Sequence, residues 1–304
     1  MNCELHCTAL ADLGALRIAG ADAVRFLQGQ LSNDVTRLTT ERALLAGYHN
    51  PQGRTIALLR LVALADGELL ALLPRELLGS VSQRLAKFVL RAKVSLTDVS
   101  REWRIGAVAS RTELEHGERA AVAPQELPAP RTGAQCLLGG RLYVTVGEQP
   151  ARWLEIARGE PLAARETARE EWRLREIRAG LAQVYAATSE QFVAQMLNLD
   201  ALDAIAFDKG CYTGQEVIAR AHYRGRVKRR AQRFRTRSAL KLAPGDGGVL
   251  SDGRAFTVVE AARLPDGRCE FLAVAPLAGA ESATAAGAAA VDAEPLELPY
   301  ALPQ

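Results

Sequence analysis

The sequence lacks the short motifs that mark several large classes of enzyme. It contains no G-x-S-x-G, no H-E-x-x-H and no G-x-x-x-x-G-K-[ST], and its four histidines do not cluster along the chain. Those motifs supply a nucleophile elbow, a zinc site and a phosphate-binding loop. The sequence therefore gives no strong case for hydrolysis, metal chemistry or nucleoside triphosphate binding.

Cysteine is also sparse. The five cysteines are an odd number and form no C-x-x-C pair, so there is no disulfide framework and the chain fits a reducing compartment. Cys3, His6 and Cys7 match no standard zinc or cluster spacing, and we predict no metal site. The N-terminus has acids where a signal peptide has lysines, and no apolar run approaches the roughly 18 residues of a membrane span. These absences predict a soluble, cytoplasmic protein without membrane contact.

The 304 residues have ordinary globular composition and predict two or three domains. Apolar runs of strand length at 56–64 and 68–73 are separated by Asp66-Gly67, which is typical of a hairpin. Residues 74–89 have apolar positions spaced by three and four, which predicts an amphipathic helix. After about residue 225, short strands alternate with Pro, Gly and Asp turns and predict a small all-β unit. The fold class is α+β.

The charged segment 161–181 predicts a helix with a tryptophan outside its apolar stripe. The stripe is formed by Leu174, Ile177 and Leu181, and at 100° per residue Trp172 lies about 180° from Leu181. A tryptophan in that position must cover a second surface. The pattern leaves two explanations open, which are contact with a neighbouring domain and stacking on a flat ligand.

The stretch DKGCYTGQEVIAR contains a lone cysteine, Cys211. Thr213 and Glu216 form a T-x-x-E pattern, which predicts a capping box and a helix that begins at Gly214. The helix dipole and Lys209 would then favour a thiolate. The alternative is a small buried side chain that packs a turn, and the residues alone do not decide between the two.

A run without acids follows this stretch. Nine lysines and arginines lie between 220 and 237 with no carboxylate, and His222, Tyr223 and Phe234 are interleaved. Although the net charge of +3 is small, this local asymmetry favours an anionic ligand or partner over a solvated basic face. Phosphates, a polycarboxylate and RNA are the candidates.

Residues 191–230, QFVAQMLNLDALDAIAFDKGCYTGQEVIARAHYRGRVKRR, closely resemble the signature of the YgfZ family of folate-binding, iron–sulfur-related proteins. Further matches are GADAVRFLQGQLSNDV, NPQGR, REIRAGL and the C-terminal LPY, so the resemblance spans nearly the whole chain. It implies the fold of the glycine-cleavage T-protein, a tetrahydrofolate-dependent aminomethyltransferase. That fold is a three-domain clover-leaf around a central folate channel. Residues 1–45 with 150–235 would form the discontinuous folate-binding domain, 46–149 a second α+β domain and 236–304 a small β-barrel.

Two positions depart from what the resemblance implies. T-proteins carry a G-G-x-x-D-D stretch whose acid acts beside the folate, whereas the matching positions here are Ala57 and Leu58. The missing carboxylate disfavours an aminomethyltransferase. Some family members stack folate between two tryptophans, and Trp172 matches the later one while Leu13 stands at the earlier position. Stacking on one ring contributes roughly 0.5–1.5 kcal/mol beyond burial, so the missing ring need not abolish binding.

The leading hypothesis is a tetrahydrofolate-binding protein that supports maturation or repair of iron–sulfur enzymes, including enzymes of tRNA modification. Its cofactor would be tetrahydrofolate or a derivative. Its partners would be iron–sulfur client or assembly proteins, with tRNA or tRNA-modifying enzymes as further candidates, and the family favours a monomer. The alternatives are a folate-dependent aminomethyltransferase or demethylase, and an RNA-binding module that uses the 220–237 run.

The resemblance also implies which residues form the site. Cys211 would act as a redox-active or transient-ligand thiol at the mouth of the folate channel. The expected cofactor-binding residues are Trp172, Lys209, Gly210, Tyr212, Gln215, Glu216, Arg220, Arg224 and Arg226. The three arginines would meet the glutamate tail of the folate or an acidic surface of a partner.

Overall fold

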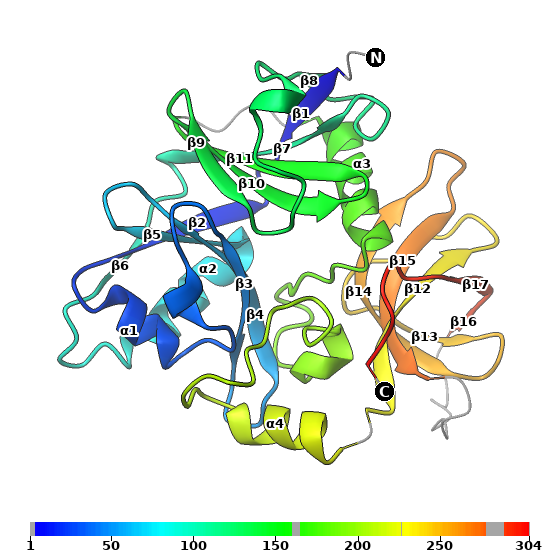
Figure 1. Cartoon of the computed structure of the whole chain (residues 1–304). Coiled ribbons are helices and arrows are strands. Elements are labelled where there is room, and N and C mark those ends of the chain that lie inside the picture. Colours follow the sequence, from blue (N-terminus) through cyan, green and yellow to red (C-terminus); the bar gives the residue numbers. More distant parts are fainter. Residues whose placement is uncertain (1–3, 160–164, 226, 278–288, 304) are drawn as a thin grey trace.

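The computed structural model describes residues 4–159, 165–225, 227–277 and 289–303, which form three lobes (Figure 1). Each lobe contains one sheet, and the predicted α+β class is confirmed. The helices are few: α1 (Ala23–Gln28), α2 (Arg75–Ala86), α3 (Glu166–Arg178) and α4 (Gln215–Tyr223), with 3-10 turns at Val35–Arg37, Pro124–Glu126 and Ala194–Leu197. Within the described ranges no helix is long and apolar enough to cross a membrane.

The lobe at the left of Figure 1 contains a five-stranded antiparallel sheet. Its strands, in spatial order, are β3 (Leu44–His49), β4 (Thr55–Ala63), β5 (Leu69–Pro74), β2 (Leu13–Ala19) and β6 (Ser95–Asp98). β4 and β5 form the predicted hairpin. Their apolar runs are nearly continuous because α2 packs on one face of the sheet and the second sheet on the other.

The lobe at the top of Figure 1 contains a six-stranded antiparallel sheet. Its order is β8 (Glu118–Arg119), β1 (Leu5–Ala9), β7 (Trp103–Ser110), β11 (Ala151–Arg158), β10 (Arg141–Glu148) and β9 (Gln135–Leu138). The N-terminal strand β1 therefore pairs with strands that come about 100 residues later in the chain. The inner faces of the two sheets share one apolar core.

The C-terminal sheet forms the third lobe and is a nearly closed barrel. Its order is β16 (Ala290–Val291), β13 (Gly247–Leu250), β14 (Ala255–Arg263), β15 (Cys269–Pro276), β12 (Arg229–Thr236) and β17 (Ala293–Leu296). The two edge strands, β16 and β17, are separated only by Asp292 in the sequence. Because consecutive residues occupy opposite edges, the sheet must curl until those edges meet. The predicted β-barrel is thus confirmed.

Helix α3 connects the lobes and buries two of its faces. Ile177 belongs to the core that includes α2 and one face of the left-hand sheet, whereas Ala168 and Trp172 belong to the core between the left-hand and top sheets. The same helix also packs on β14 and β15 of the barrel (Figure 1). Trp172 therefore covers a second surface, as its angle on the helix predicts.

The predicted capping box at the start of α4 is wrong. The helix begins at Gln215, and its N-cap is Gly214, which has a φ of 82° and makes no side-chain capping bond. This left-handed conformation favours glycine. A Cβ at Gly214 would also lie 2.5 Å from the carbonyl oxygen of Asn50, so close backbone packing and not a threonine cap sets the start of the helix.

The division of the chain into three domains, 1–45 with 150–235, 46–149 and 236–304, stays a prediction.

Candidate functional site

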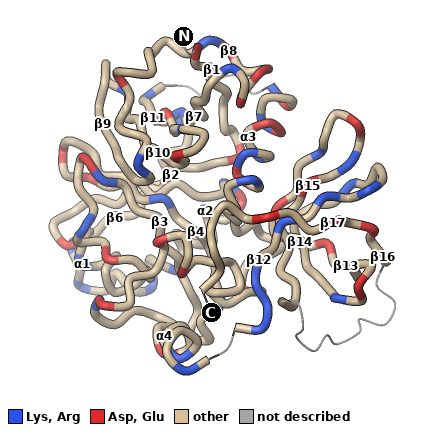
Figure 2. Tube along the Cα trace, turned by 45° about the vertical axis from the view of Figure 1, so that its right-hand side comes forward, with Lys and Arg blue, Asp and Glu red and all other residues tan. Residues whose placement is uncertain are grey.

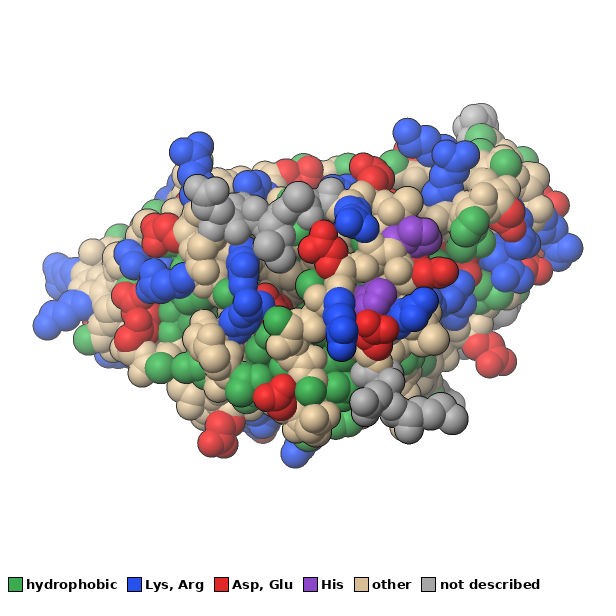
Figure 3. All heavy atoms as spheres, turned by 90° about the horizontal axis from the view of Figure 1, so that it is seen from above, with side chains coloured by type: hydrophobic (Ala, Val, Ile, Leu, Met, Phe, Trp, Pro, Cys, Tyr) green, Lys and Arg blue, Asp and Glu red, His purple; other side chains and the backbone are tan. Residues whose placement is uncertain are grey.

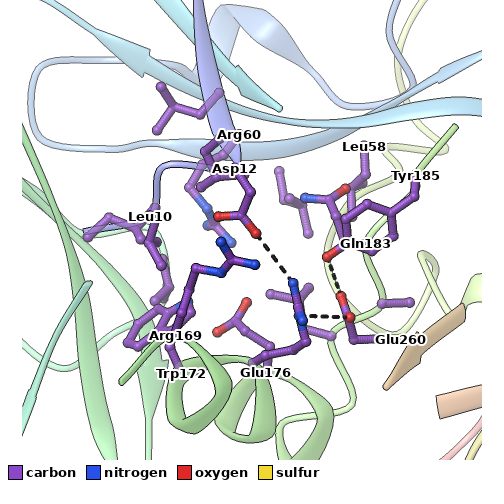
Figure 4. Close-up of a pocket in the computed structure, with 18 residues that line it drawn as sticks. Leu10, Asp12, Leu58, Arg60, Arg169, Trp172, Glu176, Gln183, Tyr185 and Glu260 are labelled. Atoms are coloured by element: carbon purple, nitrogen blue, oxygen red, sulfur yellow. Dashed lines mark hydrogen bonds and ion pairs between the residues drawn. The ribbon is translucent and has the colours of Figure 1, made fainter. Parts of the chain in front are cut away.

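A cavity lies where the three lobes meet. The space between the surrounding atoms is about 780 Å³, which includes the open solvent at the mouth of the cavity. Its lining comes from all three lobes: Leu10, Asp12, Leu13, Leu45, Leu58, Arg60, Leu72, Val146, Leu154, Arg169, Trp172, Arg173, Glu176, Leu181, Ala182, Gln183, Tyr185 and Glu260 (Figure 4). The central position agrees with the channel that the resemblance implies.

Trp172 is the aromatic residue of this cavity that the sequence singled out. Its side chain is largely buried, and the guanidinium of Arg152 lies 5.3 Å from the ring centroid. A cation at that distance over an indole is attracted by the ring and helps to fix its orientation. Leu13 lines the same cavity, so both positions of the aromatic pair expected for the family face one space.

Arg173 is the centre of a charged network in the wall. Its guanidinium contacts Asp12 at 3.5 Å, Glu170 at 2.7 Å and Glu260 at 3.3 Å. These carboxylates come from the segment before β2, from α3 itself and from β14 of the barrel. The network thus ties the three lobes together at the cavity.

Glu260 is a buried carboxyl group inside this network. The hydroxyl of Tyr185 donates to it at 2.6 Å. Burial raises the pKa of Glu260 to about 7, because the cost of removing the charge from water exceeds the favourable effect of Arg173. The cavity therefore holds one acid that changes its charge near neutral pH, together with a tyrosine whose pKa burial raises well above its usual value.

Most of the polar lining was not foreseen from the sequence. Asp12, Arg169 and Glu260 show no local pattern that distinguishes them from surface charges, because the cavity exists only when distant segments meet. Arg60 did have a signal, since it is the single charge in the apolar run 56–64. A charged residue in a strand with two covered faces needs a special environment.

The signature loop lies elsewhere. Among the predicted site residues that the structure describes, only Trp172 lines the cavity, and Lys209, Gly210, Tyr212, Gln215 and Glu216 do not. The ammonium of Lys209 donates to three backbone carbonyls, those of Gln28, Leu31 and Asn33, at 2.8, 2.7 and 2.8 Å. Burial lowers its pKa to about 8, partly opposed by Asp34. Lys209 therefore fastens this loop to the segment after α1.

The rest of the loop combines packed and exposed residues. Tyr212 is buried, and burial raises its pKa to about 12. The side chain of Gln215 accepts from the backbone N–H of Tyr212 at 3.3 Å. Gly210 and Glu216 are exposed, and Cys211 is an exposed free thiol. The backbone of Gly214 packs on Gly53, so NPQGR and the cysteine motif meet although they are far apart in the sequence.

Much of the basic run pairs with acids of neighbouring segments. Arg230 pairs with Asp200, Arg233 with Glu270, Arg235 with Glu294 and Arg237 with Asp292. Figure 2 shows the blue segment leading into β12 and acidic stretches on the strands around it. Arg220, Arg224 and Lys228 are exposed, and none of the three has an ion pair within the described ranges. Arg226 lies outside the described residues.

Glu115, His116 and Glu171 are close enough to offer three ligand atoms to a metal ion. Two of them are exposed, and the hydrogen bond that His116 donates to the carboxylate of Glu171 raises the pKa of His116. Figure 3 shows a face of the molecule on which basic, acidic and apolar side chains are interspersed. This group has the properties of an ordinary surface ion pair and gives no support for a metal centre.

Comparison with known proteins gives relatives over most of the chain, although no family model matches. The tRNA-modifying protein YgfZ of Yersinia pseudotuberculosis is 32% identical over 270 residues, which are 85% of this chain and 81% of the relative. The protein of the same name from Colwellia psychrerythraea is 32% identical over 235 residues, or 74% and 70% of the two chains.

Among solved structures, the glycine cleavage system aminomethyltransferase T from Bartonella henselae matches with a TM-score of 0.68 and 14% identity. The match covers 93% of this chain and 81% of that one. At that identity the likeness shows the fold alone, and it confirms the architecture that the resemblance implies. From its sequence relatives, the chain belongs to the YgfZ family.

Proposed function

We propose that the protein binds a reduced folate in the central cavity and, in that state, supports iron–sulfur enzymes, among them enzymes that modify tRNA. The observation that carries the proposal is the position of Trp172 in the wall of a cavity shared by three lobes. The names of the relatives support the link with tRNA modification.

The lining fits the chemistry of a reduced pterin. A flat ring gains stacking on an indole, and Trp172 provides one beside the apolar side chains of Leu13 and Leu58. The pterin edge presents N–H donors, and carboxylate oxygens such as those of Asp12 and Glu260 can accept hydrogen bonds from them. When bound, tetrahydrofolate supplies a carrier for one-carbon units, and this chain's contribution is to bind it, orient it and exclude water.

A T-protein type of amine transfer is disfavoured. Leu58 faces the cavity at one of the positions where T-proteins carry an acid, and Ala57 is buried beside it. Without a carboxylate there, no base is placed for amine chemistry on that wall. We expect no formation of methylene-tetrahydrofolate from glycine-derived or N-methyl amines, and robust turnover in that assay would contradict this conclusion.

Calorimetric titration of tetrahydrofolate tests the binding proposal. We expect saturable binding to the wild type and at least about threefold weaker binding to Trp172→Leu, because one aromatic stacking contact is lost. Trp153→Leu is the matched control, since Trp153 is buried in a separate core and does not line the cavity. That variant should keep the affinity although it loses stability. Absence of binding to the wild type would refute the proposal.

Cys211 has a role of its own in this proposal. Its exposed thiol lies on a loop that Lys209 fastens in place, so it is available for redox chemistry or transient ligation. In a strain that lacks the protein, we expect Cys211→Ala to fail in restoring the activity of an iron–sulfur tRNA-modifying enzyme. Cys136→Ala should restore it. Full restoration by Cys211→Ala would rule out the thiol role.

The exposed surface of α4 around Tyr223 supports a second function, the binding of tRNA. Tyr223 is 66% exposed, and its ring meets the edge of His222, which stacks on Phe207 at 3.7 Å. The exposed cations of Arg220, Arg224 and Lys228 lie along the same short segment. Exposed rings beside unpaired cations are what single-stranded nucleic acid needs for stacking and phosphate contact.

Salt dependence of tRNA binding tests this second function. Replacing Arg220, Arg224 and Lys228 together by glutamine should reduce the slope of log affinity against log salt by roughly 2. The control is Arg235→Gln with Arg237→Gln, two arginines that already pair with acids. If wild-type binding is absent or insensitive to salt, α4 is not an RNA surface.

A further inference from the structure

The acids that line the cavity already have partners. Asp12 and Glu260 share the guanidinium of Arg173, and Glu260 also accepts from Tyr185. Glu176 pairs with Arg152, whose side chain is almost completely buried. Each of these three acids thus contacts an arginine, either Arg152 or Arg173.

Two further arginines line the same cavity without such matching. Within the described residues, the side chains of Arg60 and Arg169 take part in no hydrogen bond or ion pair, and the Nε of Arg169 is buried without an acceptor. Figure 4 shows Arg60 reaching the cavity from β4 and Arg169 reaching it from α3, on the opposite side. Their guanidinium groups are therefore the arginine donors of the lining that contact no carboxylate in the described part of the chain.

The position of Arg60 makes this unmatched charge informative. All residues of β4 except Arg60 are buried. Side chains alternate between the two faces of a strand, so Leu58 and Arg60 both face the cavity. Burial lowers the pKa of Arg60, and the charge of Arg152 acts in the same direction while Glu176 opposes it. Packing within this strand would suit an apolar side chain, so packing alone does not explain the arginine. An anion would satisfy its donors.

We propose that Arg60 and Arg169 form a carboxylate-binding subsite of the cavity. The inference rests on the proposed function, because it concerns the same space that Trp172 lines. The wall that lacks an acid at Ala57 and Leu58 presents a guanidinium two residues further on, so it attracts an anion and repels a cationic amine. The carboxylate has two possible sources, the glutamate tail of the folate itself or a separate small carboxylate held beside the pterin.

The test compares three probes by calorimetry: tetrahydrofolate, 6-methyltetrahydropterin, which has no carboxylate, and succinate. If the folate tail is the source, Arg60→Gln and Arg169→Gln each weaken tetrahydrofolate binding by about tenfold or more and leave the pterin unchanged. If a separate carboxylate is the source, both variants bind tetrahydrofolate normally and lose the binding of succinate. Arg25→Gln, an exposed arginine of α1, is the control and should change none of these affinities.

The outcomes separate this inference from the function on which it rests. If the wild type binds succinate but neither pterin compound, the folate proposal fails and the carboxylate subsite stands. If it binds the pterin and tetrahydrofolate equally well and does not bind succinate, the folate proposal stands and the subsite is refuted. Unchanged affinity of both variants for every probe that the wild type binds also refutes the subsite. Thermal unfolding of each variant verifies that the chain still folds.

Discussion

Lys209 of the signature loop and Arg60 of the cavity are both partly buried cations, yet their donors are used in opposite ways. The ammonium of Lys209 donates to three backbone carbonyls, whereas the guanidinium of Arg60 has no partner within the described ranges. The difference shows that the most recognisable motif of the chain uses its charge to hold a fold. In our proposal, the less conspicuous Arg60 keeps its charge available for a ligand.

The largest change in stability should come from removing the hydrogen bonds that Lys209 of the signature loop donates. Lys209→Met leaves three carbonyl oxygens without their donor, and we expect it to lower the free energy of unfolding by about 3 kcal/mol. Lys228→Met is the matched control, because Lys228 is exposed and has no ion pair in the described part of the chain. Denaturant unfolding measures both. Equal stabilities would mean that Lys209 is available for function and that the comparison with Arg60 is mistaken.

Because Glu260 is buried at the cavity, the free energy of unfolding should depend on pH. Burial raises the pKa of Glu260 to about 7, against 4.5 for an ordinary glutamate. The charge of Arg173 and the hydrogen bond from Tyr185 act in the opposite direction, and the charge of Asp12 acts in the same direction as burial. As the pH rises through this window the unfolded chain ionises first, so the free energy of unfolding falls, by on the order of 3 kcal/mol. Glu260→Gln should lack this loss. If the stability difference between wild type and variant does not change between pH 4.5 and 7.5, the carboxyl group is not buried as described.

Replacing Arg60 should stabilise the fold, in contrast to replacing Lys209. We expect Arg60→Leu to raise the free energy of unfolding by about 1 kcal/mol, because an unmatched charge leaves an apolar strand. The same substitution at Arg152 should be destabilising, since it leaves Glu176 without its partner. Parallel denaturant titrations measure both signs. Marked destabilisation by Arg60→Leu would show that the arginine is structural, and the carboxylate subsite would lose its main support.

The smallest effect concerns the missing ring of the aromatic pair. Leu13→Trp should strengthen tetrahydrofolate binding by roughly threefold to tenfold, as stacking on a second ring contributes about 0.5–1.5 kcal/mol. Leu16→Trp is not a suitable control because Leu16 is fully buried, but Leu137→Trp is, since Leu137 is an exposed residue of β9. Calorimetry measures the change. A weaker affinity in Leu13→Trp would mean that the two positions do not share one ligand.

Residues with local signals could be placed from the sequence. Asp66-Gly67 predicted the β4–β5 hairpin, the spacing after Pro74 predicted α2, and the angle of Trp172 predicted a second covered surface. The capping box failed because close packing of Gly214 on Gly53 sets the start of α4.

The polar half of the cavity could not be predicted in the same way. Asp12, Arg173 and Glu260 become neighbours only when the segment before β2, helix α3 and the barrel strand β14 meet. The basic run shows the same limit, because its partners Asp200, Glu270 and Glu294 come from other segments. Charge that looks unbalanced in the sequence is therefore partly balanced in the fold.

The most direct measurement is a crystal structure of the protein with tetrahydrofolate. Our account predicts that the pterin stacks on Trp172 and that a carboxylate lies within hydrogen-bond distance of Arg60 and Arg169. A folate bound on the signature loop beside Cys211 and α4, with the cavity free of ligand, would contradict it.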